Sequence, residues 1–490
     1  MIRVQLNRRD FEYDVHSLVR AFYPGENVQV YSEIPKEEPE ELLLSVAITF
    51  TSEADGRTLV TVKFELPDGS MAKEGSESYD PDIDRKEEKN ILKRLLYRML
   101  RDHTGEDLPW GNLTGIRPTK IPMALLQAGW KNVDIARYMR ETYYTSNEKT
   151  ALAIAIANRE KHILKDIDYE NGYSLYVGIP FCPSICLYCS FSSSPLDIWR
   201  DKVDTYLDAL CKEIRYAAQE FAGKTLNTVY IGGGTPTTLE PYQLERLLTE
   251  LEQNFDYSHL LEFTVEAGRP DSITREKLEV LKAHGISRIS INPQTMNQKT
   301  LDFIGRKHTV EETEKAFALA RSLGFDNINM DLIVGLPGEG KDEVEHTMQE
   351  VLRLDPDSIT VHSLAVKRAA RLRLFKDEHK ELTFTNNREI MDMTASYAAK
   401  GGHSPYYLYR QKNMAGNFEN VGYSKEGKAG IYNILIMEEV QSILALGAGG
   451  ATKMVWEKDR IERIENVKDI RNYIDRIDEM IERKRRGLHE

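Results

Sequence analysis

The sequence predicts an α/β protein whose main domain is built from six strand–helix units. From about residue 169, short apolar runs alternate with amphipathic helical stretches, a rhythm typical of parallel sheets with crossover helices. Polar or glycine-rich segments follow the ends of these runs, where the functional sites of such sheets lie. The first hundred residues mix helix and strand patterns differently, which indicates a separate α+β domain.

Composition limits the class of protein. A chain of 490 residues is long for one domain, so two to four domains are expected. No apolar run approaches a membrane span, and the N-terminus MIRVQLNRRDF lacks the apolar core of a signal peptide. Only four cysteines occur, which favours a reducing compartment. We therefore expect a cytoplasmic protein, and the net charge of −13 argues against general nucleic-acid binding.

Residues 1–105 form the predicted N-terminal α+β domain. A helical stretch at about 13–22 precedes two β-rich runs, 42–51 and 58–66, and Asp-Gly at 55–56 between them is a hairpin signal. A charged helix with one apolar face follows. This domain shows no catalytic constellation, and we expect a structural or docking role.

The rest of the chain divides into a helical connector (106–168), an α/β core (169–368) and a C-terminal α+β region (369–490). The connector carries two or three amphipathic helices. In the core, a long helix at about 200–222 contains Cys211 among apolar residues, where it reads as a core side chain. The six predicted core strands are 173–179, 227–231, 262–267, 287–292, 327–333 and 357–364.

Three cysteines follow the first core strand, in the segment YVGIPFCPSICLYCSF (176–191). Cys182, Cys186 and Cys189 have the spacing C-x3-C-x2-C, which turns three sulfurs towards one point on a loop. Three thiolates suit a four-iron cluster and leave one iron open for a small molecule. The alternatives are a zinc site with a distant fourth ligand, a disulfide, or cysteines that only pack. Zinc sites usually show a second ligand pair, which is not visible here.

This motif, with the aromatic Tyr188 before the third cysteine, resembles that of the radical S-adenosylmethionine (radical SAM) superfamily. The flanking Y-V-x-I-P-F-C resembles one branch, the oxygen-independent coproporphyrinogen III oxidases (coproporphyrinogen dehydrogenases), and the chain length resembles their HemZ-type members. The resemblance implies a partial (β/α)6 barrel, a [4Fe–4S] cluster and SAM. In that family the reduced cluster cleaves SAM to a 5'-deoxyadenosyl radical, which abstracts hydrogen from the substrate.

The resemblance also implies a SAM site at successive strand ends. The segment GGGTPT (232–237) matches completely, whereas AGRP after Glu266 departs modestly from the family wording, and Asn292-Pro293 replaces Gly-Val. Taken alone, a glycine-rich turn after a strand is a weak signal. The expected SAM-binding residues are Tyr176, Tyr188, Gly233, Gly234, Thr235, Glu266, Gln294, Arg306 and Asp331.

Four of these residues have a specific expected role. By resemblance, Glu266 pairs with the SAM amino group, Gln294 binds the ribose or the methionyl end, Arg306 pairs with the carboxylate and Asp331 accepts from a ribose hydroxyl. From the residues alone, Glu266 reads equally as a solvated or capping side chain, Arg306 as a surface group and Asp331 as a helix cap.

The region after the sixth strand carries candidate substrate contacts. Lys367, Arg368 and Arg410, the last within the tyrosine-rich segment 405–417, would suit a macrocycle with propionates. The alternative is a solvated helix face and a tyrosine-rich core strand. In the family, a glycine-rich turn like that at 447–450 closes over the active site, and the C-terminal region covers the substrate.

The resemblance predicts oxidative decarboxylation of coproporphyrinogen III to protoporphyrinogen IX in haem biosynthesis. The substrate is then a tetrapyrrole and the reductant an unidentified low-potential electron donor, with no catalytic side chain beyond the cluster and SAM. The established decarboxylases carry a further cysteine where this chain has Phe191. In lacking that cysteine, the chain resembles a related haem-chaperone branch, which binds haem and SAM. The alternatives are therefore a haem-binding chaperone without oxidase activity and a non-enzymatic iron–sulfur protein.

Overall fold

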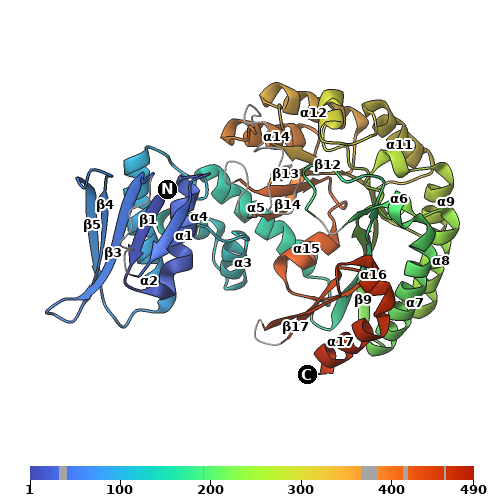
Figure 1. Ribbon diagram of the computed structural model, residues 1–490, viewed down its shortest axis with the longest axis horizontal. Coiled ribbons are helices and arrows are strands. Elements are labelled where there is room, and N and C mark those ends of the chain that lie inside the picture. The colour runs from blue at the N-terminus through green and yellow to red at the C-terminus, as the bar shows by residue number, and fades with distance from the viewer. Residues whose placement is uncertain (33–40, 191–192, 366–383, 412–417, 457–459, 490) are drawn as a thin grey trace. The chain divides into compact units, whose positions relative to one another are not determined.

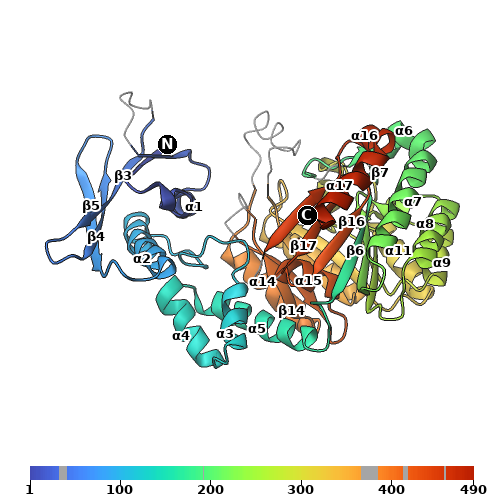
Figure 2. The ribbon, with the colours of Figure 1, turned by 90° about the horizontal axis from the view of Figure 1, so that it is seen from below.

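The computed structural model describes residues 1–32, 41–190, 193–365, 384–411, 418–456 and 460–489. The chain divides into two compact units, Met1–Asn158 and Arg159–Glu490. Figures 1 and 2 show the elements of both units from two directions. The finer division into four segments stays a prediction.

The first unit is built on a five-stranded sheet in the order β2-β1-β3-β4-β5. β1 is parallel to β2 and β3, whereas β4 is antiparallel to both of its neighbours. Helices α1 and α2 bury their apolar sides in one core with the sheet. The elements are β1 (Ile2–Leu6), α1 (Glu12–Phe22), β2 (Val28–Tyr31), β3 (Leu44–Ser52), β4 (Thr58–Glu65), β5 (Met71–Tyr79) and α2 (Arg85–Thr104).

The predicted hairpin between β3 and β4 is confirmed. Gly56 in the turn has a φ of 88°, a positive value that glycine adopts without steric strain because it has no Cβ. Three strands of this sheet were not predicted. β1 and β2 have only five and four residues, so the alternation of apolar residues in β1 is brief. β5 is longer but has the polar sequence MAKEGSESY, which lacks an apolar alternation.

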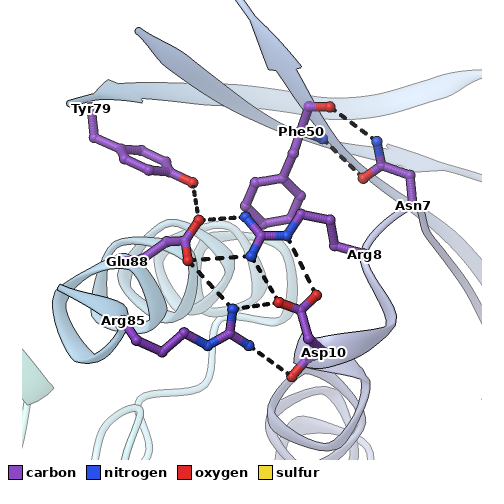
Figure 3. Close-up of polar contacts among 7 residues, drawn as sticks. All are labelled: Asn7, Arg8, Asp10, Phe50, Tyr79, Arg85 and Glu88. Atoms are coloured by element: carbon purple, nitrogen blue, oxygen red, sulfur yellow. Dashed lines mark hydrogen bonds and ion pairs between the residues drawn. The ribbon is translucent and has the colours of Figure 1, made fainter. Parts of the chain in front are cut away.

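An ion-pair cluster joins the start of α2 to the segment after β1 (Figure 3). Arg8 pairs with Asp10 and Glu88, and Arg85 pairs with the same two carboxylates. The Tyr79 hydroxyl donates to Glu88 over 2.8 Å. The hydrogen bond from Arg8 is the largest influence on Asp10 and holds its pKa down to about 2. These ion pairs connect the two segments, and because most of the side chains are partly exposed, each pair contributes little to stability.

Three helices complete the first unit, and the last of them runs on into the second. They are α3 (Lys120–Gln127), α4 (Asn132–Tyr143) and α5 (Asn147–Leu164). They confirm the predicted run of amphipathic helices. Among the residues described in both units, no helix has both the length and the apolar character that a membrane span requires.

The second unit contains an eleven-stranded sheet in the order β14-β15-β13-β12-β11-β10-β9-β6-β16-β17-β18. Its six central strands are mutually parallel, as expected from the strand–helix alternation. They are β6 (Gly172–Ile179), β9 (Thr225–Gly233), β10 (Glu262–Glu266), β11 (Arg288–Ser290), β12 (Ile328–Val334) and β13 (Ser358–Ser363).

The crossover helices form an arc on the outer side of these strands (Figure 1). Their amphipathic sequences bury one face on the sheet; on α7, for example, Leu207, Leu210 and Ile214 are buried, and Cys211 lies among them as predicted. The helices are α7 (Val203–Glu220), α8 (Pro241–Asn254), α9 (Arg275–Ala283), α11 (Val310–Ser322) and α12 (Lys341–Leu354).

The C-terminal region extends the same sheet at both ends. Two strands extend the sheet beyond β13: β15 (Asn420–Ser424), which pairs with β13, and then β14 (Ser404–Tyr409). Three strands extend it beyond β6, in the order β16 (Ser442–Leu446), β17 (Ala451–Val455) and β18 (Ile461–Glu465). Figure 2 shows β16 lying between β6 and β17. β16 is parallel to β6, and β14 runs with β13 because both are antiparallel to β15. β18 also runs with β16, because both are antiparallel to β17. Nine of the described strands therefore end on one side, which we call the carboxyl edge.

From about residue 467, the apolar spacing of a charged segment predicts a single helix, and the structure contradicts this prediction. Two helices, α16 (Ile470–Asp475) and α17 (Ile477–His489), are separated by Arg476, whose backbone leaves the helical region at φ −119° and ψ 30°. The apolar spacing of the two helices is nearly continuous, so the sequence gives little sign of the break.

Candidate functional site

The three cysteines of the motif lie on one loop at the carboxyl edge. The loop leaves β6 at Ile179, and its next residues form the two-residue strand Phe181–Cys182. All four cysteines of the chain are thiols, and Cys186 is the most buried of the three in the motif. The main-chain N–H of Leu187 donates to the carbonyl of Ile304 over 3.0 Å, which fixes the loop against the segment before Arg306.

The three thiols are close enough to influence one another. Burial raises the pKa of Cys182 most, hydrogen bonds from Thr235 and Ser193 oppose it, and the charges of Cys189 and Cys186 raise it further. Among the described residues, no three His, Cys, Asp or Glu side chains converge tightly enough to hold a single metal ion.

The glycine-rich segment after β9 packs directly on the cysteine strand. The N–H of Gly234 donates to Ile179 O, and the N–H of Thr235 to Phe181 O, each over 2.7 Å. A Cβ at Gly234 would overlap the carbonyl oxygen of Phe181, so the turn requires glycine there. The hydroxyl of Thr235 donates to Cys182 Sγ over 3.6 Å. Packing against the cysteine strand therefore accounts for the glycine at position 234.

Glu266 ends β10 beside a stack of tyrosines. The Tyr230 hydroxyl donates to Glu266 Oε1. The Tyr230 ring stacks on Tyr176, with the centroids 6.2 Å apart, and on Tyr432, at 4.6 Å. Burial raises the pKa of Glu266 to about 7, although the Tyr230 hydrogen bond opposes this. An added positive group would favour the ionised carboxylate.

Gln294 has a strained main chain and an unsatisfied side chain. Its φ is 69°, a left-handed value that is uncommon for a residue with a Cβ. In the part of the chain that the structure describes, its buried Oε1 has no hydrogen-bond partner. Its N–H donates to Asp331 O over 3.0 Å, which joins the ends of β11 and β12. A strained, unpaired polar residue is a frequent feature of ligand sites.

Asp331 lies on β12 near His362 of β13, with His362 Nε2 and Asp331 Oδ2 3.9 Å apart. Asn329 Nδ2 donates to Asp331 Oδ1 over 2.7 Å. Burial alone would raise the pKa of Asp331, but the hydrogen bonds and charge of His362, with Asn329, hold it below its usual value. Asp331 is therefore ionised at neutral pH, whereas the pKa of the neighbouring Glu266 is about 7.

Arg306 contacts the cysteine loop at Tyr188. Arg306 is 4% exposed, so it is not the surface group that its sequence context allowed. Its Nη2 donates to Gly268 O over 3.1 Å and its Nη1 to the Tyr188 hydroxyl over 3.4 Å. Its Nε is buried without a partner among the described residues.

The predicted substrate residues are placed only in part. Lys367 and Arg368 lie outside the described residues, as does Phe191. Arg410 follows β14 at the carboxyl edge, and burial lowers its pKa to about 10, partly opposed by the charge of Glu419. Of the tyrosine-rich segment, residues 405–409 lie in β14, where Tyr406 and Tyr407 are buried, as the core-strand alternative expected. Residues 412–417 lie outside the described residues.

Sequence reasoning missed Tyr230, His362 and Arg269 as members of this site. Tyr230 and His362 lie near the ends of predicted strands, and that position was the available signal. Arg269 lies in the AGRP segment, where it appeared only as a departure from the family wording.

The chain is similar in sequence to several known proteins. The radical SAM superfamily model matches residues 176–351. The oxygen-independent coproporphyrinogen-III oxidase-like protein HemZ of Bacillus subtilis (strain 168) is 40% identical over 427 residues, 86% of this chain and 84% of the relative. The heme chaperone HemW of the same strain is 40% identical over 195 residues, 40% of this chain and 51% of the relative.

Two further comparisons concern oxygen-independent coproporphyrinogen III oxidase. The Escherichia coli (strain K12) protein is 33% identical over 248 residues, 50% of this chain and 53% of the relative. The solved structure of coproporphyrinogen III oxidase (HemN) from Escherichia coli superposes with a TM-score of 0.52 at 24% identity. It covers 66% of this chain and 73% of that one, and it shows the likeness of fold.

Proposed function

Because this chain belongs to the radical SAM superfamily, and within it to the family of oxygen-independent coproporphyrinogen III oxidase-like proteins, we propose that it oxidises coproporphyrinogen III to protoporphyrinogen IX. Members of the superfamily use a [4Fe–4S] cluster and SAM. When bound, these two groups supply the 5'-deoxyadenosyl radical that removes a hydrogen atom from the substrate. The protein's own task is to bind, orient and shield the reactants.

The observation that carries the proposal is the meeting of two groups of side chains at the carboxyl edge. The thiols of Cys182, Cys186 and Cys189 would hold the cluster, since soft sulfur ligands suit iron–sulfur sites. The unsatisfied Oε1 of Gln294 and Nε of Arg306 are buried polar atoms that await a ligand, and both belong to the predicted SAM site. The three cysteines therefore suit the cluster, and the buried polar atoms of Gln294 and Arg306 suit SAM.

The chain's SAM-binding residues would act by charge and shape. Glu266 would pair with the amino group of SAM, a contact that favours its ionised form. Asp331, held ionised beside His362, would accept from a ribose hydroxyl. Gly233 and Gly234 let the main chain approach the ligand closely, and Arg306 would pair with the SAM carboxylate.

The substrate assignment rests on chemistry at the same edge. Each of two propionates would lose a hydrogen atom, carbon dioxide and one electron, the electron passing to an external acceptor, to leave a vinyl group. Arg410 would bind a propionate, because a guanidinium forms forked hydrogen bonds with a carboxylate. A low-potential electron donor would reduce the cluster before each turnover.

The test is anaerobic turnover. Reconstituted protein with dithionite, SAM and coproporphyrinogen III should yield protoporphyrinogen IX together with 5'-deoxyadenosine and carbon dioxide. Formation of 5'-deoxyadenosine without a decarboxylated porphyrinogen would refute the substrate assignment. A Cys182→Ala variant, which keeps the rest of the site, is the matched negative control.

A second candidate function is haem binding without oxidase activity. It is favoured by the 40% identity to a heme chaperone over 195 residues, and by Phe191 in place of a fourth cysteine. Stable binding of one haem per chain, in protein that does not turn over coproporphyrinogen III, would favour this function. Absence of haem binding would remove it.

A further inference from the structure

Arg269 lies behind the cysteine loop and contacts it directly. Its side chain is 4% exposed. Its Nη1 donates to Cys186 Sγ over 3.6 Å, a normal length for a sulfur acceptor, and also to Ser184 Oγ over 3.1 Å and Ser184 O over 3.4 Å. One terminal nitrogen of a buried guanidinium is thus directed at the middle cysteine of the motif.

Asp271 fixes the orientation of this guanidinium. Arg269 Nε donates to Asp271 Oδ1 over 2.9 Å and Nη2 to Oδ2 over 2.6 Å, the forked geometry that orders both side chains. The main chain is also held, because Ser272 Oγ donates to Arg269 O over 2.7 Å. With two of its nitrogens engaged by the carboxylate, the third can point only to the cysteine loop.

The charges around Arg269 are unbalanced within the described residues. Arg269 and Arg306 each carry one positive charge and Asp271 one negative charge, so the three sum to +1. His308 is fully buried beside them, and burial, reinforced by the charge of Arg306, lowers its pKa to about 3, which keeps it neutral. A buried positive charge requires a negative partner, and the sulfur of Cys186 would supply one when it ligates the cluster.

We propose that Arg269, oriented by Asp271, is a positioning residue for the iron–sulfur cluster that donates an N–H to the ligating sulfur of Cys186. The proposal rests on the proposed ligation by the three cysteines. Donation to a ligating sulfur withdraws electron density and stabilises the reduced cluster, so it raises the reduction potential. It would also hold Cys186 and its part of the loop in place when SAM binds.

The test is a redox titration of reconstituted protein followed by the paramagnetic signal of the reduced cluster. Arg269→Met should shift the midpoint potential to a more negative value and speed the loss of iron to a chelator. Arg269→Lys, which keeps the charge but not the fork, should give a smaller shift of the same sign. The matched control is Arg288→Met: Arg288 is equally buried but begins β11 at the opposite edge, and its loss should leave the potential unchanged.

A second variant tests the proposal even if the Arg269 variants do not fold. Asp271→Asn keeps Arg269 but removes the carboxylate that orients it, and it should speed the loss of iron to a chelator. Its potential does not serve as the readout, because the loss of a negative charge would by itself make the potential more positive. An unchanged or more positive potential in folded Arg269→Met, with iron retained as in the wild type, would overturn the proposal. Failure of the proposed function would appear differently, as a wild-type protein that assembles no cluster or decarboxylates no porphyrinogen.

Discussion

The ammonium nitrogen of Lys484 lies 2.7 Å from Oε1 of Glu213, and both side chains are completely buried. Lys484 belongs to α17 and Glu213 to α7. The other carboxylate oxygen of Glu213 accepts from the N–H of Gly447 over 2.8 Å and from the Tyr473 hydroxyl over 2.6 Å. The pair therefore connects the last helix to the glycine-rich turn that follows β16 at the carboxyl edge.

Breaking this pair should destabilise the protein strongly. Lys484→Met leaves the Glu213 carboxylate buried without its countercharge, so we expect the free energy of unfolding to fall by about 3–5 kcal/mol. Urea denaturation measures it. The double variant Lys484→Met, Glu213→Leu should recover much of the loss, because it removes the orphaned charge as well.

The control for this prediction lies on the same helix. Arg486 pairs with Glu482 at the surface, and Arg486→Met should cost less than about 1 kcal/mol. Equal effects of the Lys484 and Arg486 variants would show that the buried pair has no special structural weight.

Cluster assembly should depend on three of the four cysteines. Changing Cys182, Cys186 or Cys189 to alanine should abolish retention of a [4Fe–4S] cluster, since each removes one soft ligand. Cys211→Ala should retain it, because this thiol is buried on the apolar face of α7. Iron content per chain and the paramagnetic signal of the reduced protein distinguish these outcomes, and a cluster persisting in Cys186→Ala would contradict the assignment.

The strained main chain of Gln294 predicts a trade between stability and SAM binding. Gln294→Gly should raise the free energy of unfolding by about 1 kcal/mol, because glycine accepts a φ of 69° without strain. The same change should weaken SAM binding, measured by calorimetry under anaerobic conditions. Asp355→Gly, at a φ of 58° after α12, is the matched control and should leave SAM affinity as in the wild type.

Glu266 should give the protein a specific pH dependence. Burial raises its pKa from 4.5 to about 7, so between these values the folded protein holds a proton that the unfolded chain releases. The free energy of unfolding should therefore fall as the pH rises from about 4.5 to 7, by about 1–3 kcal/mol. Glu266→Gln, which cannot titrate, should lose this part of the profile measured by urea denaturation.

Tyr230→Phe provides the complementary control for that measurement. It removes the hydrogen bond that lowers the pKa of Glu266, so the fall in stability should extend to higher pH. Identical profiles for the wild type and Glu266→Gln would contradict the raised pKa.

The sequence alone determined the part of this protein that depends on local pattern and chain order. The spacing of Cys182, Cys186 and Cys189 is local, and the six core strands were each marked by an apolar run and a strand-end signal. Parallel strands joined by crossover helices bring all their carboxyl ends to one edge. The order of the motifs was therefore enough to predict that residues as distant as Glu266 and Asp331 share a site.

Only the tertiary structure decided which distant side chains complete that site. Arg269 reaches Cys186 across 83 residues of sequence, and Lys484 meets Glu213 through helices at opposite ends of the second unit's chain. Likewise, β16 returns to pair with β6, which places the turn at Gly447 beside the cysteine strand. An arginine, a lysine or a short apolar run has no local mark that names its partner. Burial and charge pairing between elements choose it, and these arise only when the chain is folded.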